Sequence, residues 1–433
     1  MDRSNSIATQ LVAPGDAIYA LAAKIFPICR SITGNGVRET LRLITEHISL
    51  DVHEMPTGAS VFDWTIPKEW NIRDAYIRDA RGDKIVDFAN SNLHVMSYSA
   101  PVNARLSLTD LKKHIHTLPK QPDLIPYRTT YYSEDWGFCM THRQLESLKD
   151  GIYEVVIDSR LADGALTYAE HLHKGETEDE ILLSAHTCHP SLANDNCSAV
   201  ALLTLLAERI GAIKTRYSYR FLFTPGTIGA IAWLAKNEDK VGRIKHGLVL
   251  AGVGDRGAPT YKKSRNGNRE IDRVLTHALA QTGRPATVLD FSPYGYNERQ
   301  FCSPGFDLSV GLFQRSLWGS FPEYHTSADN LDFISPDALE DSYRIITNAI
   351  AILEGNRIYR NTLPKCEPQL GKRGLYSAIA NDADATAKNM AMLWLLNLSD
   401  GTHSLLDIAE RAKIPFQTIK ETAALLVREG LLK

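Results

Sequence analysis

Residues 186–199 read HTCHPSLANDNCSA, and this segment places two histidines, two cysteines and one aspartate within twelve residues. The apolar run EILLSA at 180–185 precedes it, and AVALLTLLAERI at 199–210 follows it with apolar residues at helical spacing. The polar cluster is therefore expected where a buried strand ends and a helix begins. A metal site, a redox site and a simple polar turn are all open at this point.

Strands and helices alternate on both sides of this segment. Short apolar runs at 218–225, 246–254 and 310–316 predict strands, and each is followed along the chain by a segment with helical periodicity. Alternation of this kind predicts an α/β fold with a mostly parallel sheet and helices on both faces. We also expect the runs at 153–161 and 165–175 to pair as a hairpin. Ligands in such folds bind beyond the carboxyl ends of the strands, where residues 186–196 lie.

The chain divides into three parts by composition. Tryptophans, prolines and short β-rich runs predict an inserted α+β domain at 52–130, within a discontinuous α/β domain at 1–51 and 131–360. Residues 361–433 read as helix, turn with Gly401, helix, turn with Pro415 and helix, which is typical of a winged-helix-like domain. From residue 391 onward basic and acidic residues number five each, so nucleic-acid binding is not expected. A packing or dimerisation module is the alternative.

Charge and hydropathy limit the partners. The chain has 48 basic and 51 acidic residues, which gives no electrostatic case for a nucleic acid or an anionic membrane. No apolar run reaches the ~18 residues that a membrane span needs. The N-terminal MDRSNSIATQ lacks the pattern of a signal peptide. We therefore expect a cytoplasmic protein that acts on a small molecule, with a homo-oligomer left open.

Six cysteines without a CxxC pair argue against a disulfide framework, a thioredoxin-type redox pair and a zinc ribbon. The remaining signal is a set of imidazoles and carboxylates. His186 ends the first strand, Asp195 lies in the turn before the helix, and FPEYHTSADN at 321–330 contains His325 and Asp329. Taken alone, His186 could be a hydrogen-bonded core residue and His325 a surface-loop residue. Asp195 and Asp329 could each be a helix cap. Together they are typical of a hydrolytic zinc site, with Asp329 orienting His325.

The motifs LLSAHTC…NDNCSAVALL and EYHTSADN resemble those of the zinc aminopeptidase clan with co-catalytic metals. The resemblance matches His186 to the first histidine ligand, Asp195 to the metal-bridging aspartate and His325 to the last histidine, with Asp329 as its partner. The whole layout, including RSITGNG, YYSEDWGFC and SPYGYNERQFCSPGF, is similar to aminopeptidase-like proteins with an inserted α+β domain and a C-terminal winged helix. That resemblance implies a zinc-exopeptidase-like fold and a role in modified carbohydrate biosynthesis.

The sequence departs from the peptidase pattern at several ligands. Cys188 stands where the clan has an aspartate behind the first histidine, and Gly226 and Thr227 stand near the positions of its two glutamates. No carboxylate occurs between residues 216 and 237, and Asp255 is the nearest to a further aspartate ligand. His186, Asp195 and His325 remain, which is enough for one zinc ion with an open position.

Hydrolysis also needs a general base and contacts to the substrate. Glu298 in YGYNERQF is the first candidate for the base and Glu323 the second, although either could be a surface glutamate. His189 is a further ligand, an acid or an exposed turn residue, and Lys262 and Arg265 lie in a short basic loop that could meet an anion. The candidates for substrate contacts, each with a structural role as its alternative, are Arg30, His94, Trp136 and Tyr324.

The prediction is a zinc-dependent, aminopeptidase-like hydrolase that cuts an amide bond in a small amino-acid or sugar conjugate. One alternative is a non-peptidase enzyme of modified carbohydrate biosynthesis on the same scaffold, which the missing glutamates favour over a general peptidase. Another is a catalytically inactive binding or regulatory protein. Retention of a zinc ligand set argues against that last alternative.

Overall fold

The computed structural model describes residues 14–375 and 383–433. Two compact units are present. The main unit comprises Ala13–Asp272 and Pro285–Tyr343, and the C-terminal unit comprises Arg273–Arg284 and Arg344–Lys433 among the described residues. No helix in the described ranges is long and apolar enough to cross a membrane.

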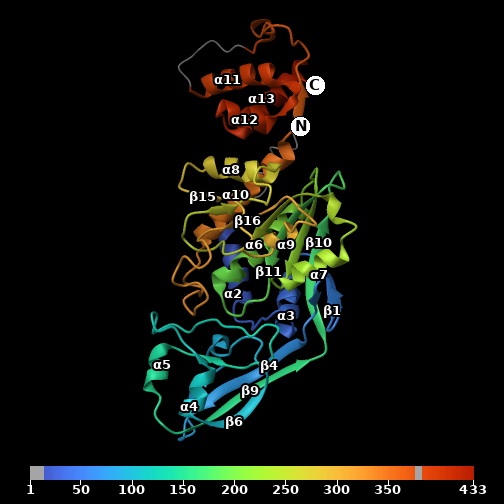
Figure 1. Cartoon of the computed structure of the whole chain (residues 1–433). Coiled ribbons are helices and arrows are strands. Elements are labelled where there is room, and N and C mark those ends of the chain that lie inside the picture. Colours follow the sequence, from blue (N-terminus) through green and yellow to red (C-terminus); the bar gives the residue numbers. More distant parts are fainter. Residues whose placement is uncertain (1–13, 376–382) are drawn as a thin grey trace. The chain divides into compact units, whose positions relative to one another are not determined.

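An eight-stranded sheet forms the centre of the main unit (Figure 1). Its order is β1 (Asp51–Pro56), β10 (Ala165–His173), β12 (Ser218–Thr224), β11 (Glu180–His186), β13 (Ile244–Leu250), β16 (Val310–Gln314), β14 (Thr260–Lys262) and β15 (Thr287–Leu289). The four strands from β12 to β16 are mutually parallel, whereas β1, β10 and β14 run antiparallel to a neighbour. Every residue of β11 is buried, as expected for an apolar central strand.

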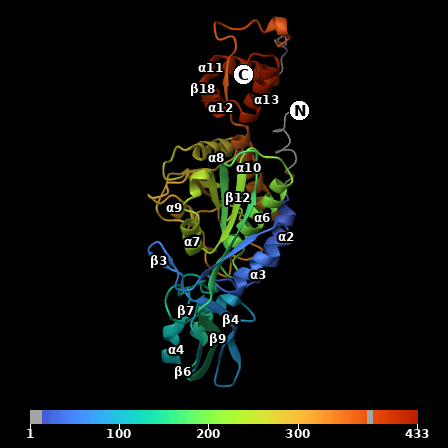
Figure 2. The same ribbon diagram turned by 90° about the vertical axis from the view of Figure 1, so that its right-hand side faces the viewer.

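Helices cover both faces of this sheet. Figure 2 shows α2 (Gly15–Ile25) and α6 (Ala199–Gly211) on one side of β12, with α7 (Ile228–Lys236) and α9 (Glu298–Phe301) on the other. α3 (Asn35–Ile44) contacts β10. The helices α8 (Glu270–Ala280) and α10 (Pro336–Gly355) complete the α/β part of the chain. The predicted fold class, a mostly parallel sheet with helices on both faces, is confirmed.

A second, four-stranded sheet belongs to the inserted α+β part. Its order is β5 (Lys84–Asp87), β4 (Glu69–Arg78), β9 (Ile152–Ala162) and β6 (Val102–Ser107), with all neighbours antiparallel. Short elements surround it, namely β2 (Ser60–Val61), β3 (Trp64–Thr65), β7 (Ile115–His116), β8 (Phe138–Cys139), α4 (Leu108–Leu111) and α5 (His142–Ser147). Its own core includes Ile77, Val86, Phe138 and Val155.

The predicted hairpin of residues 153–161 and 165–175 is wrong. β9 pairs with β4 and β6 in the smaller sheet, whereas β10 pairs with β1 and β12 in the larger one. The chain changes sheets at Gly164, where an added Cβ would lie 2.6 Å from the Cβ of Glu69, so no side chain fits there. The inserted domain predicted at 52–130 therefore differs at both ends. Its sheet includes β9, which lies beyond residue 130, and β1, at the predicted start of the domain, belongs to the larger sheet.

Arg38 of α3 holds this junction through Glu69 of β4. The guanidinium donates two hydrogen bonds to the carboxylate, at 2.8 and 2.7 Å, and the backbone N–H of Ala165 donates a third at 3.0 Å. The bond from Arg38 is the main reason why the pKa of Glu69 falls to about 2. The ion pair thus joins α3 to the inserted sheet, and the Ala165 hydrogen bond joins the same carboxylate to the start of β10.

We expect Glu69→Gln to lower the thermal midpoint at neutral pH. Because the folded-state pKa of Glu69 lies below its ordinary value of 4.5, this stabilisation is present above that pH and is lost as the pH falls toward about 2. Melting curves from pH 7 downward should therefore show the difference between variant and parent shrinking below pH 4.5. Glu134→Gln, which breaks an exposed pair with Lys68, is the control. A constant difference at all pH values would contradict the prediction.

Beyond α10, the described residues of the C-terminal unit form three α-helices and a two-stranded ribbon. α11 (Ala383–Leu398), α12 (Leu405–Ala412) and α13 (Phe416–Arg428) follow β17 (Ile358–Arg360), and β18 (Asp400–Ser404) pairs with β17. Ser404 and Asp407 form a capping box that starts α12. Gly401 and Pro415 both separate these helices, but Gly401 lies within β18 rather than in the predicted turn, whereas Pro415 directly precedes α13.

Candidate metal centre

His186 and Asp195 lie at the carboxyl end of the central strand. β11 ends at His186, a loop follows, and a short helical turn (Ala193–Ser198) carries Asp195 into the start of α6. His325 comes from the loop before α10. Both His186 and Asp195 are 2% exposed at the side chain, whereas His325 is 28% exposed. Hence one side of the cluster is closed by the core and the other is reachable.

Three imidazoles surround the Asp195 carboxylate. Nε2 of His186 lies 2.8 Å from Oδ1 of Asp195, and Nε2 of His325 lies 3.0 Å from Oδ2. Nδ1 of His189 lies 3.0 Å from Nε2 of His186 and 3.8 Å from Oδ1 of Asp195. The structure therefore brings together the three predicted ligands and adds His189 as a close fourth group.

Asn196 holds the His186 ring. Its amide nitrogen lies 3.1 Å from Nδ1 of His186 and also donates to the carbonyl oxygens of His186 and Leu250, at 3.3 Å each. Its Oδ1 accepts the N–H of Gly252 at 3.1 Å. With the amide fixed by backbone groups on β11 and after β13, the ring is oriented so that Nε2 faces Asp195.

Asp329 positions Asp195 through the backbone. Its carboxylate accepts the N–H of Asn194 at 2.6 Å and that of Asp195 at 3.0 Å. Burial, the larger influence, raises the pKa of Asp329 to about 8. The sequence predicts that Asp329 orients His325. In the structure the Asp329 carboxylate instead accepts hydrogen bonds from the turn that carries Asp195.

Charge and burial act in opposite directions on the cluster. Burial alone would raise the pKa of Asp195, but the neighbouring imidazoles outweigh it and hold the pKa well below its usual range. Burial lowers the pKa of His189 to about 3, so this imidazole is neutral at pH 7. A carboxylate beside neutral imidazole is the form in which these groups bind metals.

The residues present fit a zinc ion. The ligand atoms of His186, His189 and Asp195 all lie within 4.8 Å of one another, and two or three imidazoles with one carboxylate are a usual zinc set. Cys188 does not join them, because burial raises the pKa of its thiol to about 12 and its Sγ accepts the N–H of Gly226 at 3.3 Å. Cys197 likewise accepts a hydrogen bond from Arg30.

Gly226 is near the position at which the resemblance to the peptidases implies a carboxylate. A Cβ there would lie 3.3 Å from the Cβ of His186 and 3.4 Å from Oδ1 of Asn297. That side of the site holds Asn297, whose Nδ2 donates to Thr224 at 3.1 Å. Its buried Oδ1 accepts no hydrogen bond from the described residues. An amide oxygen thus faces the position of the missing glutamate.

Glu298, the first candidate for a base, lies in a buried ion pair. Its Oε1 is 2.5 Å from Nζ of Lys262, and the two side chains are 0% and 1% exposed. Lys262 also donates to the carbonyl oxygens of Ser292 and Tyr294. The Glu323 carboxylate makes no hydrogen bond to another described side chain, and its backbone carbonyl accepts one from Thr326. Arg265, from the predicted basic loop, pairs with Asp307.

Three of the four predicted substrate residues make contacts with groups outside the histidine cluster. Arg30 is buried and donates to the carbonyl oxygens of Ile25 and Pro190 as well as to Cys197. His94 is buried, with Nδ1 2.8 Å from the carbonyl oxygen of Cys139. Trp136 stacks on His114 at 3.8 Å, away from the cluster. Tyr324 lies at the site, because its ring stacks on His325 at 3.9 Å.

Sequence reasoning missed three further tyrosines at the cluster. The Tyr127 ring lies 5.1 Å from those of His189 and His325, and its hydroxyl is 2.7 Å from that of Tyr131. The Tyr296 ring stacks on His186 at 5.0 Å and its hydroxyl bonds that of Tyr324. No local pattern distinguishes such residues from core aromatics, because only the fold brings them to the histidines.

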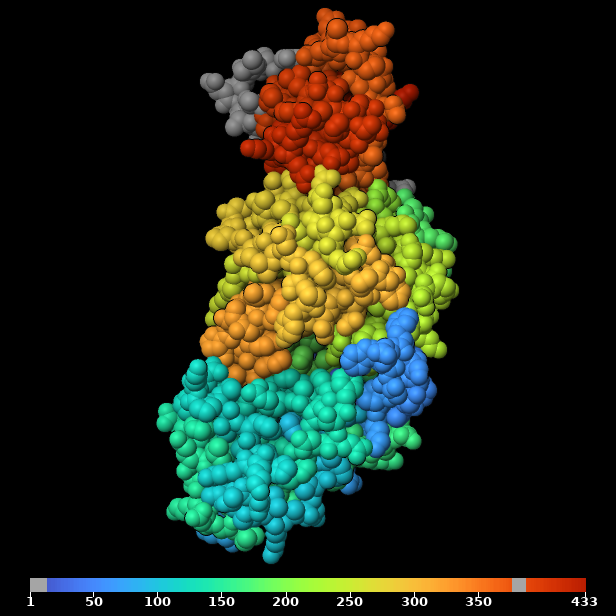
Figure 3. All heavy atoms as spheres, viewed as in Figure 1, coloured from blue at the N-terminus to red at the C-terminus, as the bar shows by residue number. Residues whose placement is uncertain are grey.

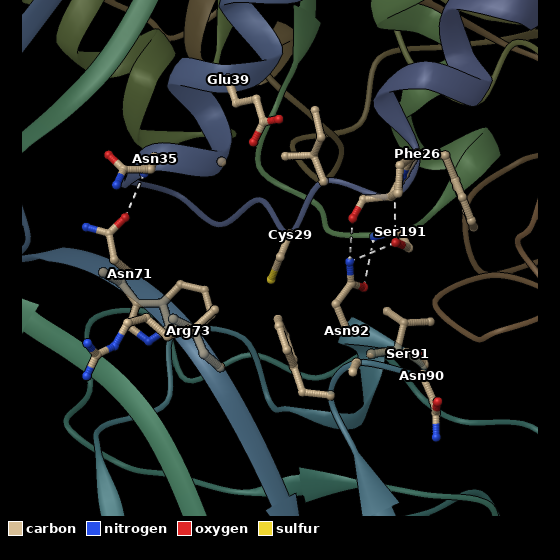
Figure 4. Close-up of a pocket in the computed structure, with 18 of the residues that line it drawn as sticks. Phe26, Cys29, Asn35, Glu39, Asn71, Arg73, Asn90, Ser91, Asn92 and Ser191 are labelled. Carbon is tan, nitrogen blue, oxygen red and sulfur yellow. Dashed lines mark hydrogen bonds between the residues drawn. The ribbon is translucent and has the colours of Figure 1, made fainter.

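A cavity of about 770 Å³ lies behind the two loops that carry the site histidines (Figure 4). Ser191 and Ser327, each two residues after a histidine of the cluster, line it together with Cys29 and Asn92. Asn92 donates to Ser191 Oγ at 2.8 Å and so ties the inserted part to the His189 loop. Arg30 is not among the lining residues, which agrees with its internal bonds.

Family models match nearly the whole chain. Residues 19–356 match the family described as a domain of unknown function (DUF4910), and residues 357–433 match a winged helix-turn-helix. The second match confirms the predicted C-terminal winged helix. A Clostridium acetobutylicum protein called "Putative polysaccharide biosynthesis protein with aminopeptidase-like domain" is 52% identical over the full length of both chains.

Solved structures give the same fold. The crystal structure of a putative peptidase from Clostridium acetobutylicum is 51% identical, covers 99% of this chain and 98% of its own, and has a TM-score of 0.93. A zinc aminopeptidase from Bacillus subtilis has a TM-score of 0.58 at 14% identity, over 78% of this chain and 95% of its own. The resemblance to zinc aminopeptidases is therefore confirmed at the level of the fold.

Proposed function

The chain belongs to the DUF4910 family, whose fold here is that of zinc aminopeptidases, and from this premise we propose that it is a zinc-dependent hydrolase of an amide bond in a small sugar or amino-acid conjugate. The observation that carries the proposal is the convergence of His186, His189 and His325 on the two oxygens of Asp195. The name of the Clostridium acetobutylicum relative favours a biosynthetic sugar conjugate as the substrate.

His186, His189 and Asp195 would hold the zinc ion, with His325 on the other oxygen of the carboxylate. Bound there, zinc would act as a Lewis acid toward an amide carbonyl. Tyr296 and Tyr324 supply hydroxyl groups beside it, and burial raises the pKa of both above the usual range. Both hydroxyls therefore keep their protons, and because one donates to the other, the second can donate a hydrogen bond to the substrate oxygen.

Asn297 suits a substrate with an N–H group. Its buried Oδ1 has no donor among the described residues and lies beside the position of Gly226. A buried acceptor without a partner is costly, and an amide N–H of the substrate would satisfy it. The Asn297 oxygen cannot take up a proton as a glutamate carboxylate does. Asn297 therefore cannot replace a peptidase's general base, which favours a specialised substrate over general peptides.

Hydrolysis tests the proposal directly. Zinc-loaded protein is incubated with N-acetylated hexosamines and, separately, with amino-acid p-nitroanilides, and released acetate or nitroaniline is measured. We expect release from the sugar amides, loss of that release in His325→Ala, and little cleavage of the anilides. His403→Ala, a histidine of similar exposure in the C-terminal unit, is the control. Zinc-loaded protein that cleaves neither class would refute the hydrolase.

A further inference from the structure

Three large aromatic side chains gather on the surface of the main unit. Phe62 and Trp64 lie on the β2–β3 hairpin and are 51% and 43% exposed, and Tyr132 is 47% exposed. The Trp64 and Tyr132 rings are 5.5 Å apart, and Phe62 contacts Phe306 at 5.8 Å. We call Phe62, Trp64 and Tyr132 the aromatic platform. Single exposed aromatics need no explanation, but a cluster of them marks a binding surface.

The backbone of the platform is strained. Phe62 has φ of 55° and Tyr132 has φ of 66°, in the left-handed region that bulky side chains avoid. Such a conformation costs on the order of 1 kcal/mol and is normally adopted by glycine or asparagine. Half-exposed rings contribute little to the core, so folding gives no reason to keep aromatic residues at these two positions. Strain of this kind is typical of ligand-binding positions.

A row of aromatic rings connects the platform to the metal centre. The Tyr132 ring lies 6.2 Å from that of Tyr131, whose hydroxyl bonds Tyr127 at 2.7 Å. Tyr127 in turn contacts His189 and His325. Figure 2 shows the hairpin with β3 projecting from the main unit, and in Figure 3 the blue segment borders a hollow between the cyan and orange segments. Contacts between packed rings thus join the platform to the cluster.

We propose that the platform holds a neutral sugar ring of the substrate, an inference that rests on the proposed hydrolase and names its substrate class. A pyranose has one apolar C–H face and a rim of hydroxyls, so it can stack on a ring and stay partly hydrated. A ligand with an aliphatic side chain fits less well, because half-exposed rings would leave part of its apolar surface in water.

Local charge disfavours a nucleotide. Asp63 lies at the tip of the hairpin, and Glu134 and Asp135 follow Tyr132 closely. Only Glu134 pairs with a cation, Lys68, among the described residues. The excess of negative charge opposes phosphate groups, whereas carboxylates accept hydrogen bonds from sugar hydroxyls.

Fluorine NMR of protein labelled with 5-fluorotryptophan tests the platform. The chain has six tryptophans, and Trp64→Phe assigns the Trp64 resonance. The probe is the β-1,4-linked tetramer of N-acetylglucosamine, added to the metal-free His186→Ala protein. We expect a saturable shift of Trp64, while the buried Trp70 and Trp233 stay unmoved. Tyr132→Ala should weaken binding by about tenfold, whereas Ile152→Ala, which removes an exposed apolar side chain on β9, should not.

Each other outcome overturns the proposal. No movement of Trp64 at 50 mM tetramer would exclude a sugar platform, and a shift with leucinamide or uridine but not with the tetramer would assign a different ligand. Because binding is measured without metal or turnover, its result is separate from the hydrolysis test. Binding without hydrolysis would refute only the proposed hydrolase, and hydrolysis without a Trp64 response would refute only the platform.

Discussion

Asp195→Asn is expected to reduce bound zinc from about one ion per chain to near zero. Both oxygens of Asp195 contact imidazoles, Oδ1 at 2.8 Å from His186 and Oδ2 at 3.0 Å from His325. Asparagine keeps the shape of the side chain but replaces one carboxylate oxygen with an N–H₂ group and removes the charge. Zinc loses its anionic ligand, and the amide N–H₂ cannot bind it.

Plasma mass spectrometry after dialysis against zinc measures the content, and circular dichroism checks that the variant folds. Asp290→Asn, which changes a carboxylate that is 90% exposed, is the matched control and should keep its zinc. An Asp195→Asn protein with unchanged zinc content would show that the metal binds elsewhere. About two ions per chain in the parent would mean that residues beyond this cluster serve as ligands.

The second large effect is on stability. Glu298→Gln is expected to lower the free energy of unfolding by about 3–5 kcal/mol, because it leaves the Lys262 ammonium buried without its anion. The two side chains are 0% and 1% exposed, and the two backbone carbonyls that accept from Lys262 carry no full charge. Urea unfolding followed by tryptophan fluorescence measures the change.

Removing both charges should restore most of the loss. The double variant Lys262→Met/Glu298→Leu leaves no buried ion, so its stability should lie closer to that of the parent than Glu298→Gln does. Lys263→Met breaks the neighbouring surface pair with Asp290 and should cost less than about 1 kcal/mol. A stable Glu298→Gln protein would contradict the structural role of the pair.

Measuring the turnover of the Glu298 variants separates the structural role of the ion pair from a catalytic role of Glu298. A general base at Glu298 requires that the stable double variant be inactive, even when fully folded and loaded with zinc. A purely structural pair requires that it retain activity. Since Lys262 already neutralises the carboxylate, the geometry favours the structural role, and the double variant decides between the two.

The sequence by itself determined the local parts of this protein. EILLSA predicts a fully buried strand because it is apolar on both faces, and the separation of nine positions between His186 and Asp195 places both at the end of that strand. The three helices around Gly401 and Pro415 follow from helical periodicity and turn residues in the same way. Such signals are local, so a short segment is enough to show them.

Only the tertiary structure decided which distant residues meet. The strands at 152–162 and 165–173 are adjacent in the sequence but pair in different sheets, because strand pairing depends on partners far along the chain. From the sequence, Glu298 is a candidate base in a loop until β14 brings Lys262 to it, and Trp136 is a candidate substrate contact until His114 stacks on it. How deeply a side chain is buried, and which charges and rings surround it, depends on the packing of distant segments. These contacts, which the local sequence does not contain, decide what Glu298 and Trp136 can do.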